Sequence, residues 1–73
     1  MEKVSVVIPA YNASQTIEEL IQKIQTVLQS LMFNYEIIII DDSSKDNTWE
    51  KLQQAKTKYS FLKISQKQIF ADL

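Results

Sequence analysis

The chain has 73 residues, 45% of them hydrophobic, a net charge of -1, and no histidine, cysteine or glycine. A chain of this length forms at most one small domain, and its composition excludes a Ser-His-Asp triad, a thiolate metal site and a disulfide framework. The dispersed, nearly balanced charge gives no electrostatic footprint for nucleic acid. The first residues lack a secretory-signal pattern, and no apolar run approaches the roughly 20 residues that span a bilayer, so we expect a cytoplasmic protein without a transmembrane segment.

The first half of the chain predicts a strand followed by a helix. Residues Val4 to Ile8 are mostly β-branched and end at Pro9, which is typical of a buried parallel strand. From Ser14 or Thr16 to about residue 32, apolar side chains recur at intervals of three and four, which predicts an amphipathic helix. These side chains are Ile17, Leu20, Ile21, Ile24, Val27, Leu28 and Leu31. Thr16 and Glu19 predict a capping box at its start, with Ser14 as the competing cap.

The second half predicts two further strands and a helix. Glu36 to Ile40 contains four consecutive isoleucines, which favours a central strand buried on both faces. Asp46 is interpreted as the N-cap of a second helix that ends near residue 60. One face of that helix carries Trp49, Leu52, Ala55 or Lys56, and Tyr59. Phe61 to Ser65 predicts a third strand, and residues 66–73 form an unassigned tail.

The order strand, helix, strand, helix, strand predicts an α/β fold. Right-handed crossovers arrange such a chain as a three-layer, Rossmann-like parallel sheet with strand order 3-2-1. A sheet of three strands keeps two unpaired edges, so residues 1–65 are expected to form only half of a doubly wound domain. An exposed sheet edge of this kind could pair with a complementing chain or with a second copy.

Two adjacent carboxylates, Asp41 and Asp42, follow the central strand directly. Ligands of open α/β sheets bind outside the carboxyl ends of the strands, so we expect a binding site at these acids. The alternative is a solvated turn in which one acid caps the following helix. A receiver domain carries its acidic pair after the first strand instead, and a nicotinamide-binding unit needs a glycine-rich turn that this chain lacks.

Two segments carry a resemblance to a known family. Residues 4–12 read VSVVIPAYN and residues 35–49 read YEIIIIDDSSKDNTW. Together they resemble the opening of a family 2 glycosyltransferase of the GT-A fold, and are similar to polyprenyl-phosphate sugar transferases such as dolichol-phosphate mannose synthase. The resemblance extends over about residues 3–65. It implies that residues 1–65 are an incomplete GT-A nucleotide-binding half-domain.

The resemblance also implies a site and its ligand. The ligand is a GDP- or UDP-linked sugar, which the family transfers, in the similar enzymes to polyprenyl phosphate at the cytoplasmic membrane face. Positions matching Pro9 and Tyr11 contact the base and ribose, and the carboxylate matching Asp42 accepts hydrogen bonds from uracil or guanine N–H groups. The Ile40 backbone lies against the base, and Asp41 anchors the loop or adds charge. The complete set of expected nucleotide-binding residues is Pro9, Ala10, Tyr11, Asn12, Ile40, Asp41 and Asp42.

The resemblance does not extend to the catalytic groups. The similar enzymes carry an acid where this chain has Ala13, and a basic, glycine-containing stretch after the third strand where this chain has none. In the family, a later Asp-x-Asp holds Mg or Mn, and a later carboxylate is the base. We therefore assign no catalytic residue, metal ligand or bound cofactor, and expect this chain alone to be inactive. The alternatives are a truncated or frameshifted remnant, or a split half that needs a partner chain.

Overall fold

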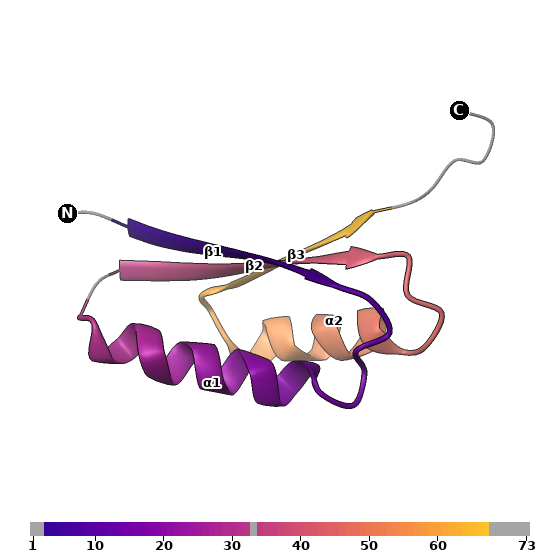
Figure 1. The fold of residues 1–73 in the computed structure, drawn as a ribbon, viewed down its shortest axis with the longest axis horizontal. Helices are drawn as coiled ribbons and strands as arrows, with labels where there is room; N and C mark the ends of the chain where they lie inside the picture. Colours follow the sequence, from indigo (N-terminus) through magenta and orange to yellow (C-terminus); the bar gives the residue numbers. More distant parts are fainter. Residues whose placement is uncertain (1–2, 33, 68–73) are drawn as a thin grey trace.

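The residues that the structure describes form a parallel sheet and two helices (Figure 1). The computed structural model describes residues 3–32 and 34–67. In chain order the elements are β1 (Lys3–Ala10), α1 (Ile17–Ser30), β2 (Asn34–Asp42), α2 (Thr48–Lys58) and β3 (Leu62–Lys67). The strands are parallel in the order β1-β2-β3, with β2 in the centre. This confirms the predicted α/β, Rossmann-like half-domain.

The strands are longer than the sequence pattern predicts. Pro9 and Ala10 belong to β1, and both acids, Asp41 and Asp42, belong to β2 instead of following it. β3 continues through residues 66 and 67, which the sequence pattern left in the unassigned tail. The rest of that tail, residues 68–73, lies outside the described residues.

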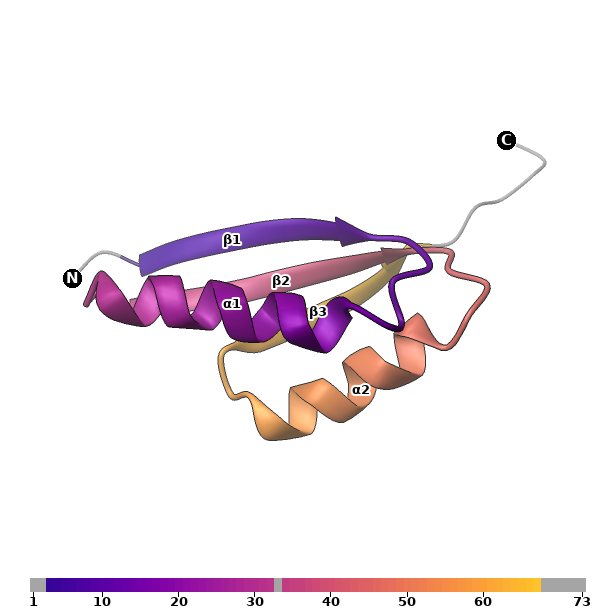
Figure 2. The same cartoon turned by 60° about the horizontal axis from the view of Figure 1, so that its bottom comes forward.

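Both helices pack on the same face of the sheet, as Figures 1 and 2 show from two directions. The described residues therefore form two layers, and the expected third layer is not among them. Two crossovers of the same handedness that step in the same direction along a sheet leave their helices on one side. The opposite side, here called the helix-free face, carries alternate residues of each strand. These residues are Lys3, Ser5, Val7, Pro9, Asn34, Glu36, Ile38, Ile40, Asp42, Lys63, Ser65 and Lys67.

The four isoleucines of β2 are divided between the two faces. Ile37 and Ile39 have no exposed surface, whereas Ile38 and Ile40 are half-buried. The prediction that this strand is buried on both faces is therefore wrong for the described residues. Side chains alternate along a strand, and helices cover only one side of this sheet. β1 alternates in the same way, and Val7 on its helix-free side is 57% exposed.

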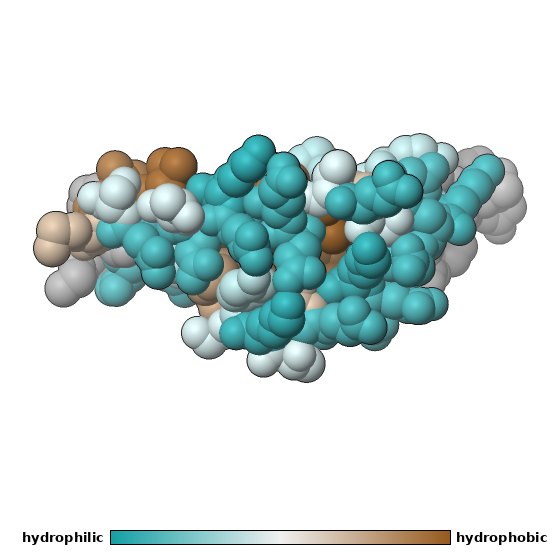
Figure 3. Space-filling model, turned by 90° about the horizontal axis from the view of Figure 1, so that it is seen from below, coloured by the Kyte–Doolittle hydropathy of each residue, from teal (hydrophilic) through white to brown (hydrophobic). Residues whose placement is uncertain are grey.

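The core lies between the sheet and the helices. α1 contributes Ile17, Ile21 and Leu28, and α2 contributes Leu52 and Ala55. Not all of the apolar side chains that predict α1 are buried, and three of them are exposed. These are Leu20, Val27 and Leu31. The outer surface of the helices is mostly hydrophilic, as Figure 3 shows, which fits a layer that faces water.

The helices begin differently from the predicted caps. Thr16 is the N-cap of α1, but its side chain makes no capping hydrogen bond, so the predicted capping box is wrong. Glu19 instead forms an ion pair with Lys23, 3.1 Å away. The N-cap of α2 is Asn47, not Asp46. Within the described residues, neither helix is long and apolar enough to cross a membrane.

Candidate functional site

The carboxyl ends of all three strands meet at one edge of the sheet. Ala10, Asp41 and Gln66 occupy one register level, and Asp42 lies beside Lys67 at the next. The arrowheads of the strands end together in Figure 2. Two connecting segments leave this edge, the first loop (residues 11–16) and the second loop (residues 43–47). This is the edge where open α/β sheets bind ligands.

The predicted site residues of the strands are divided between the two sides of the sheet. Pro9, Ile40 and Asp42 lie on the helix-free face, where Pro9 and Ile40 are register partners. Ala10 and Asp41 lie on the helix side and are 5% and 0% exposed. The structure therefore brings the first three together, and separates them from the other two by the thickness of the sheet.

Asp41 is held inside the protein by the second loop. Its Oδ1 atom accepts a hydrogen bond from the Ser44 backbone N–H at 3.3 Å and a second one from the Ser44 hydroxyl. Because the side chain has no exposed surface, this carboxylate has no route to a ligand in solution. Its contacts are those of an anchor for the loop.

Asp42 has the opposite environment. Its side chain is half-buried on the helix-free face, and its Oδ1 atom is buried without a hydrogen-bond donor among the residues that the structure describes. A buried acceptor without a donor costs about 1–3 kcal/mol of desolvation. Such groups are rare in folded proteins. Asp41 Oδ2 is a second buried oxygen without a donor among the described residues, but the Asp42 side chain is only half-buried and lies on the uncovered face, so Asp42 is the acid that a donor from outside the described residues can reach.

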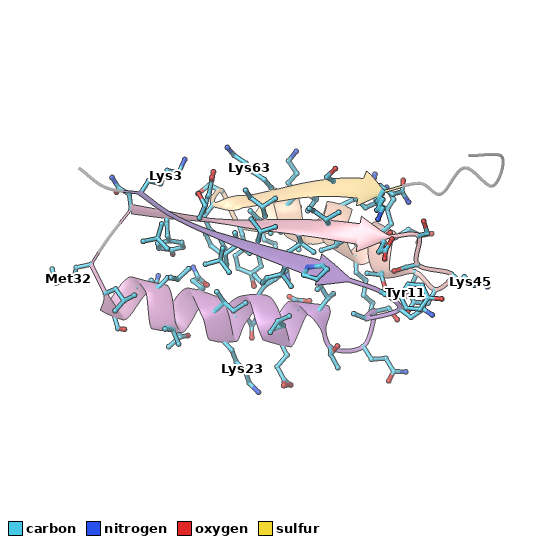
Figure 4. All side chains as sticks on the ribbon, turned by 45° about the horizontal axis from the view of Figure 1, so that its top comes forward. Lys3, Tyr11, Lys23, Met32, Lys45 and Lys63 are labelled. Carbon is cyan, nitrogen blue, oxygen red and sulfur yellow. The ribbon has the colours of Figure 1, made fainter. Side chains whose placement is uncertain are left out.

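The first loop presents an aromatic ring beside this edge. Tyr11 is 56% exposed, and Figure 4 shows it at the carboxyl end of the sheet near Lys45 of the second loop. The next residue, Asn12, has a φ of 49°, in the left-handed region that favours glycine. Asparagine tolerates this region better than most residues because its short side chain forms local hydrogen bonds.

The two loops are joined by hydrogen bonds near Asn12. The Asn12 backbone N–H donates to Ser44 Oγ at 2.9 Å, and the Lys45 backbone N–H donates to Asn12 Oδ1 at 2.8 Å. Asn12 therefore contacts the second loop through both its backbone and its side chain. Sequence reasoning selected Asn12 but missed Ser44, because no local pattern links residues 32 positions apart.

A second group of contacts joins the loops closer to the helices. The Ala13 N–H donates to Thr48 Oγ1 at 2.8 Å, and the Ser14 N–H donates to Asp46 Oδ2 at 3.2 Å. Asp46 Oδ1 also accepts a hydrogen bond from the Thr48 N–H at 3.0 Å. This acid therefore binds a backbone N–H in the first turn of α2, although it precedes the N-cap residue Asn47. The Thr48 hydroxyl, then its backbone N–H and Ser14, lower the pKa of Asp46 to about 2 despite the opposing effect of burial.

A separate ionic cluster lies at the amino end of the helix-free face. Glu36 Oε1 is 3.1 Å from Lys3 Nζ and 2.9 Å from Lys63 Nζ, and Glu36 Oε2 accepts from the Ser5 hydroxyl at 2.6 Å. The Ser5 hydroxyl, followed by the two lysines, lowers the pKa of Glu36 to about 2. Figure 4 shows Lys3 and Lys63 near this end, away from Tyr11. The cluster joins all three strands.

The adjacent acids do not form a metal site. Asp41 and Asp42 point to opposite sides of β2, so their carboxylates do not converge on one cation. Within residues 3–32 and 34–67, no three side chains of the metal-ligating types come together. The described residues therefore do not fit the Mg or Mn ion that the resemblance implies for a complete family domain.

Comparisons with known proteins identify the family of this chain. The family described as glycosyl transferase family 2 matches residues 5–68. The chain is also similar to a dolichol-phosphate mannosyltransferase from Pyrococcus furiosus, with 53% identity over 57 residues. This match covers 78% of the chain and 16% of that relative. The chain therefore spans about a sixth of the length of the relative that it matches.

Proposed function

The chain belongs to glycosyl transferase family 2, and on that basis we propose that the carboxyl edge of its sheet binds the nucleoside part of a nucleotide-sugar donor. The observation that carries the proposal is the buried Oδ1 atom of Asp42, which lacks a donor among the described residues. Uracil offers one ring N–H, and guanine offers a ring N–H beside an amino group. Either base satisfies an acceptor that a carboxylate provides.

The other expected site residues have roles in this proposal that follow from their places. Tyr11 supplies an exposed ring on which a base or ribose stacks. Pro9 and Ile40 form the apolar floor beside Asp42 on the helix-free face. Asn12 and Asp41 hold the loops, and Ala10 lies buried beneath them. Asp42 and Tyr11 are therefore the two groups that we assign to direct contact.

The finer assignment of donor and acceptor rests on the relative. Its name specifies mannosyl transfer to dolichol phosphate, so we propose a GDP- or UDP-linked hexose as donor and a polyprenyl phosphate as acceptor. A membrane-bound acceptor favours a peripheral location at the cytoplasmic membrane face. Because the chain covers 16% of that relative, we assign the Mg or Mn ion and the catalytic base to the rest of a full-length family domain.

Two alternatives remain for this chain by itself. One is an inactive remnant that keeps the fold without its ligand. The other is a split half that requires a complementing chain, which is favoured by the exposed apolar surface of the helix-free face at Val7. Measuring nucleotide binding by the chain alone separates both from the main proposal.

The test is calorimetric titration of the chain with GDP and UDP, with ADP as a comparison. We expect one of the first two to bind, and Asp42→Ala to weaken that binding by about 10-fold to 100-fold, the range for a hydrogen bond to a charged group. The matched control is Glu50→Ala, which removes an exposed carboxylate from α2. It should leave the dissociation constant within about twofold, because exposed charges contribute little.

A stability measurement completes the test. Asp42→Ala removes a buried acceptor that has no donor in the described residues, so it should keep or raise the free energy of unfolding. Loss of binding with retained stability identifies a residue kept for its ligand. If neither nucleotide binds the wild-type chain, or if Asp42→Ala binds as tightly as Glu50→Ala, the nucleoside site is wrong.

A further inference from the structure

We propose that Ser44 is a positioning residue that fixes Tyr11 relative to Asp42, through hydrogen bonds that link the first loop to the buried carboxylate of Asp41. This inference rests on the proposed nucleoside site, because Tyr11 and Asp42 are its two contact groups. They belong to different strand ends. β1 ends at Ala10, so the sheet does not hold Tyr11 directly.

Ser44 lies between the two parts of the site. Its hydroxyl oxygen accepts the Asn12 backbone N–H at 2.9 Å, and its hydroxyl proton is donated to Asp41 Oδ1. Asp41 is fully buried and paired with both neighbouring strands. The backbone next to Tyr11 is thus connected through one hydroxyl group to the residue that precedes Asp42.

The backbone on both sides of this connection is in the left-handed region, which Asn12 tolerates and which is unfavourable for Ser43. Asn12 has a φ of 49° and Ser43 a φ of 60°, and the chain contains no glycine. Non-glycine residues remain in the left-handed region only where surrounding contacts impose it. The bond from Lys45 N–H to Asn12 Oδ1 is one such contact. Hydrogen bonds, and not backbone preference, therefore set the position of Tyr11.

The Ser44 contacts can be removed without separating the loops. Ala13 remains bonded to Thr48, and Ser14 to Asp46, at the end of the loops nearer the helices. We therefore expect Ser44→Ala to fold and to loosen only the segment around Tyr11. The control is Ser30→Ala, which removes a hydroxyl bond to Val27 O in α1.

The test is a double-mutant cycle with the nucleotide, GDP or UDP, that binds the wild-type chain. In the wild-type background, Ser44→Ala should raise the dissociation constant of the nucleotide by about tenfold, the upper range for a neutral hydrogen bond. In a Tyr11→Ala background, the same change should raise the dissociation constant by less than about twofold. In that background the group that Ser44 positions is gone. The thermal midpoint should fall equally in both backgrounds, and Ser30→Ala should leave binding unchanged. Ser44→Thr, which keeps the hydroxyl, should restore binding.

Equal losses of affinity in the two backgrounds would mean that Ser44 acts through general stability, and the positioning role would be rejected. No loss in the wild-type background would reject it as well.

Amide exchange of the ligand-free chain, followed by NMR, separates this inference from the proposed function. Ser44→Ala should speed exchange at the Asn12 amide by about tenfold, because that amide loses its acceptor, and leave the Ala13 amide unchanged. If neither nucleotide binds but Asn12 exchange responds in this way, the proposed ligand is wrong and the loop connection stands. An unchanged Asn12 amide overturns the connection itself.

Discussion

Neighbouring isoleucines of β2 provide a direct test of the two-layer packing. Ile39 is fully buried between sheet and helices, whereas Ile38 is half-buried on the helix-free face. Replacing a buried isoleucine by alanine costs about 2–5 kcal/mol, which includes the cavity left behind. At about 0.05–0.15 kcal/mol per residue, a domain of this size has a total stability of about 4–11 kcal/mol. Ile39→Ala should therefore remove a large part of it.

Ile38→Ala deletes the same atoms on the other face. Part of the Ile38 surface is already in water and neither of the two described helices packs over it, so we expect a loss of about 1 kcal/mol or less. Urea unfolding followed by Trp49 fluorescence measures both variants, since Trp49 packs half-buried against the core. If Ile39→Ala is unfolded without urea, Ile39→Val supplies a smaller step of about 0.5–1.5 kcal/mol. Equal losses at positions 38 and 39 would refute the division of β2 into a covered and an uncovered side.

Two further predictions concern charge and backbone conformation. The pKa of Glu36 is lowered from 4.5 to about 2, so its contribution to stability is complete above about pH 4.5 and is lost as the pH falls toward 2. At pH 7, thermal melts should show a lower midpoint for Glu36→Gln than for wild type, and this difference should disappear by about pH 2. The control is Glu19→Gln, which removes an exposed ion pair and should hardly change the melting midpoint at either pH. Met32 follows α1 and has a φ of 58°, a region that glycine adopts more easily than methionine. Met32→Gly should therefore raise the free energy of unfolding by about 0.5–1 kcal/mol. The control, Gln29→Gly inside the helix, should lower the free energy of unfolding by about 1 kcal/mol. A loss of stability in Met32→Gly would contradict the left-handed backbone at that position.

The elements and the strand direction could be predicted because their signals are local. The β-branched runs around Val6 and Ile38 indicate strands, and the apolar repeat from Ile17 to Leu28 indicates a helix. The position of the candidate site follows from the same information, since parallel strands bring their carboxyl ends to one edge. The resemblance then adds the ligand class, which no periodicity supplies.

The caps and loop contacts could not be predicted because they depend on partners far along the chain. Asp46 carries a good capping side chain, but it accepts from Ser14, 32 positions away, as well as from Thr48. Ser and Asn side chains bond to whichever backbone group is near, and only the folded structure brings Asn12 to Ser44. The pattern identifies residues able to make such bonds without identifying which bonds form.

The different environments of Asp41 and Asp42 follow from the continuation of β2 through both residues. Had the strand ended at Ile40, as the sequence pattern predicts, both acids would lie in a flexible turn with similar access to solvent. Because the strand continues, alternation places Asp41 on the side of Ile39 and Asp42 on the side of Ile40. The helix layer then buries Asp41, whose Oδ1 atom accepts from Ser44, and leaves Asp42 half-buried on the open side. Each acid keeps one buried oxygen, Asp41 Oδ2 and Asp42 Oδ1, that lacks a donor among the described residues, but only the Asp42 side chain lies on the uncovered face. One of two chemically identical neighbours therefore anchors a loop, and the other is the acid that we propose contacts the nucleoside.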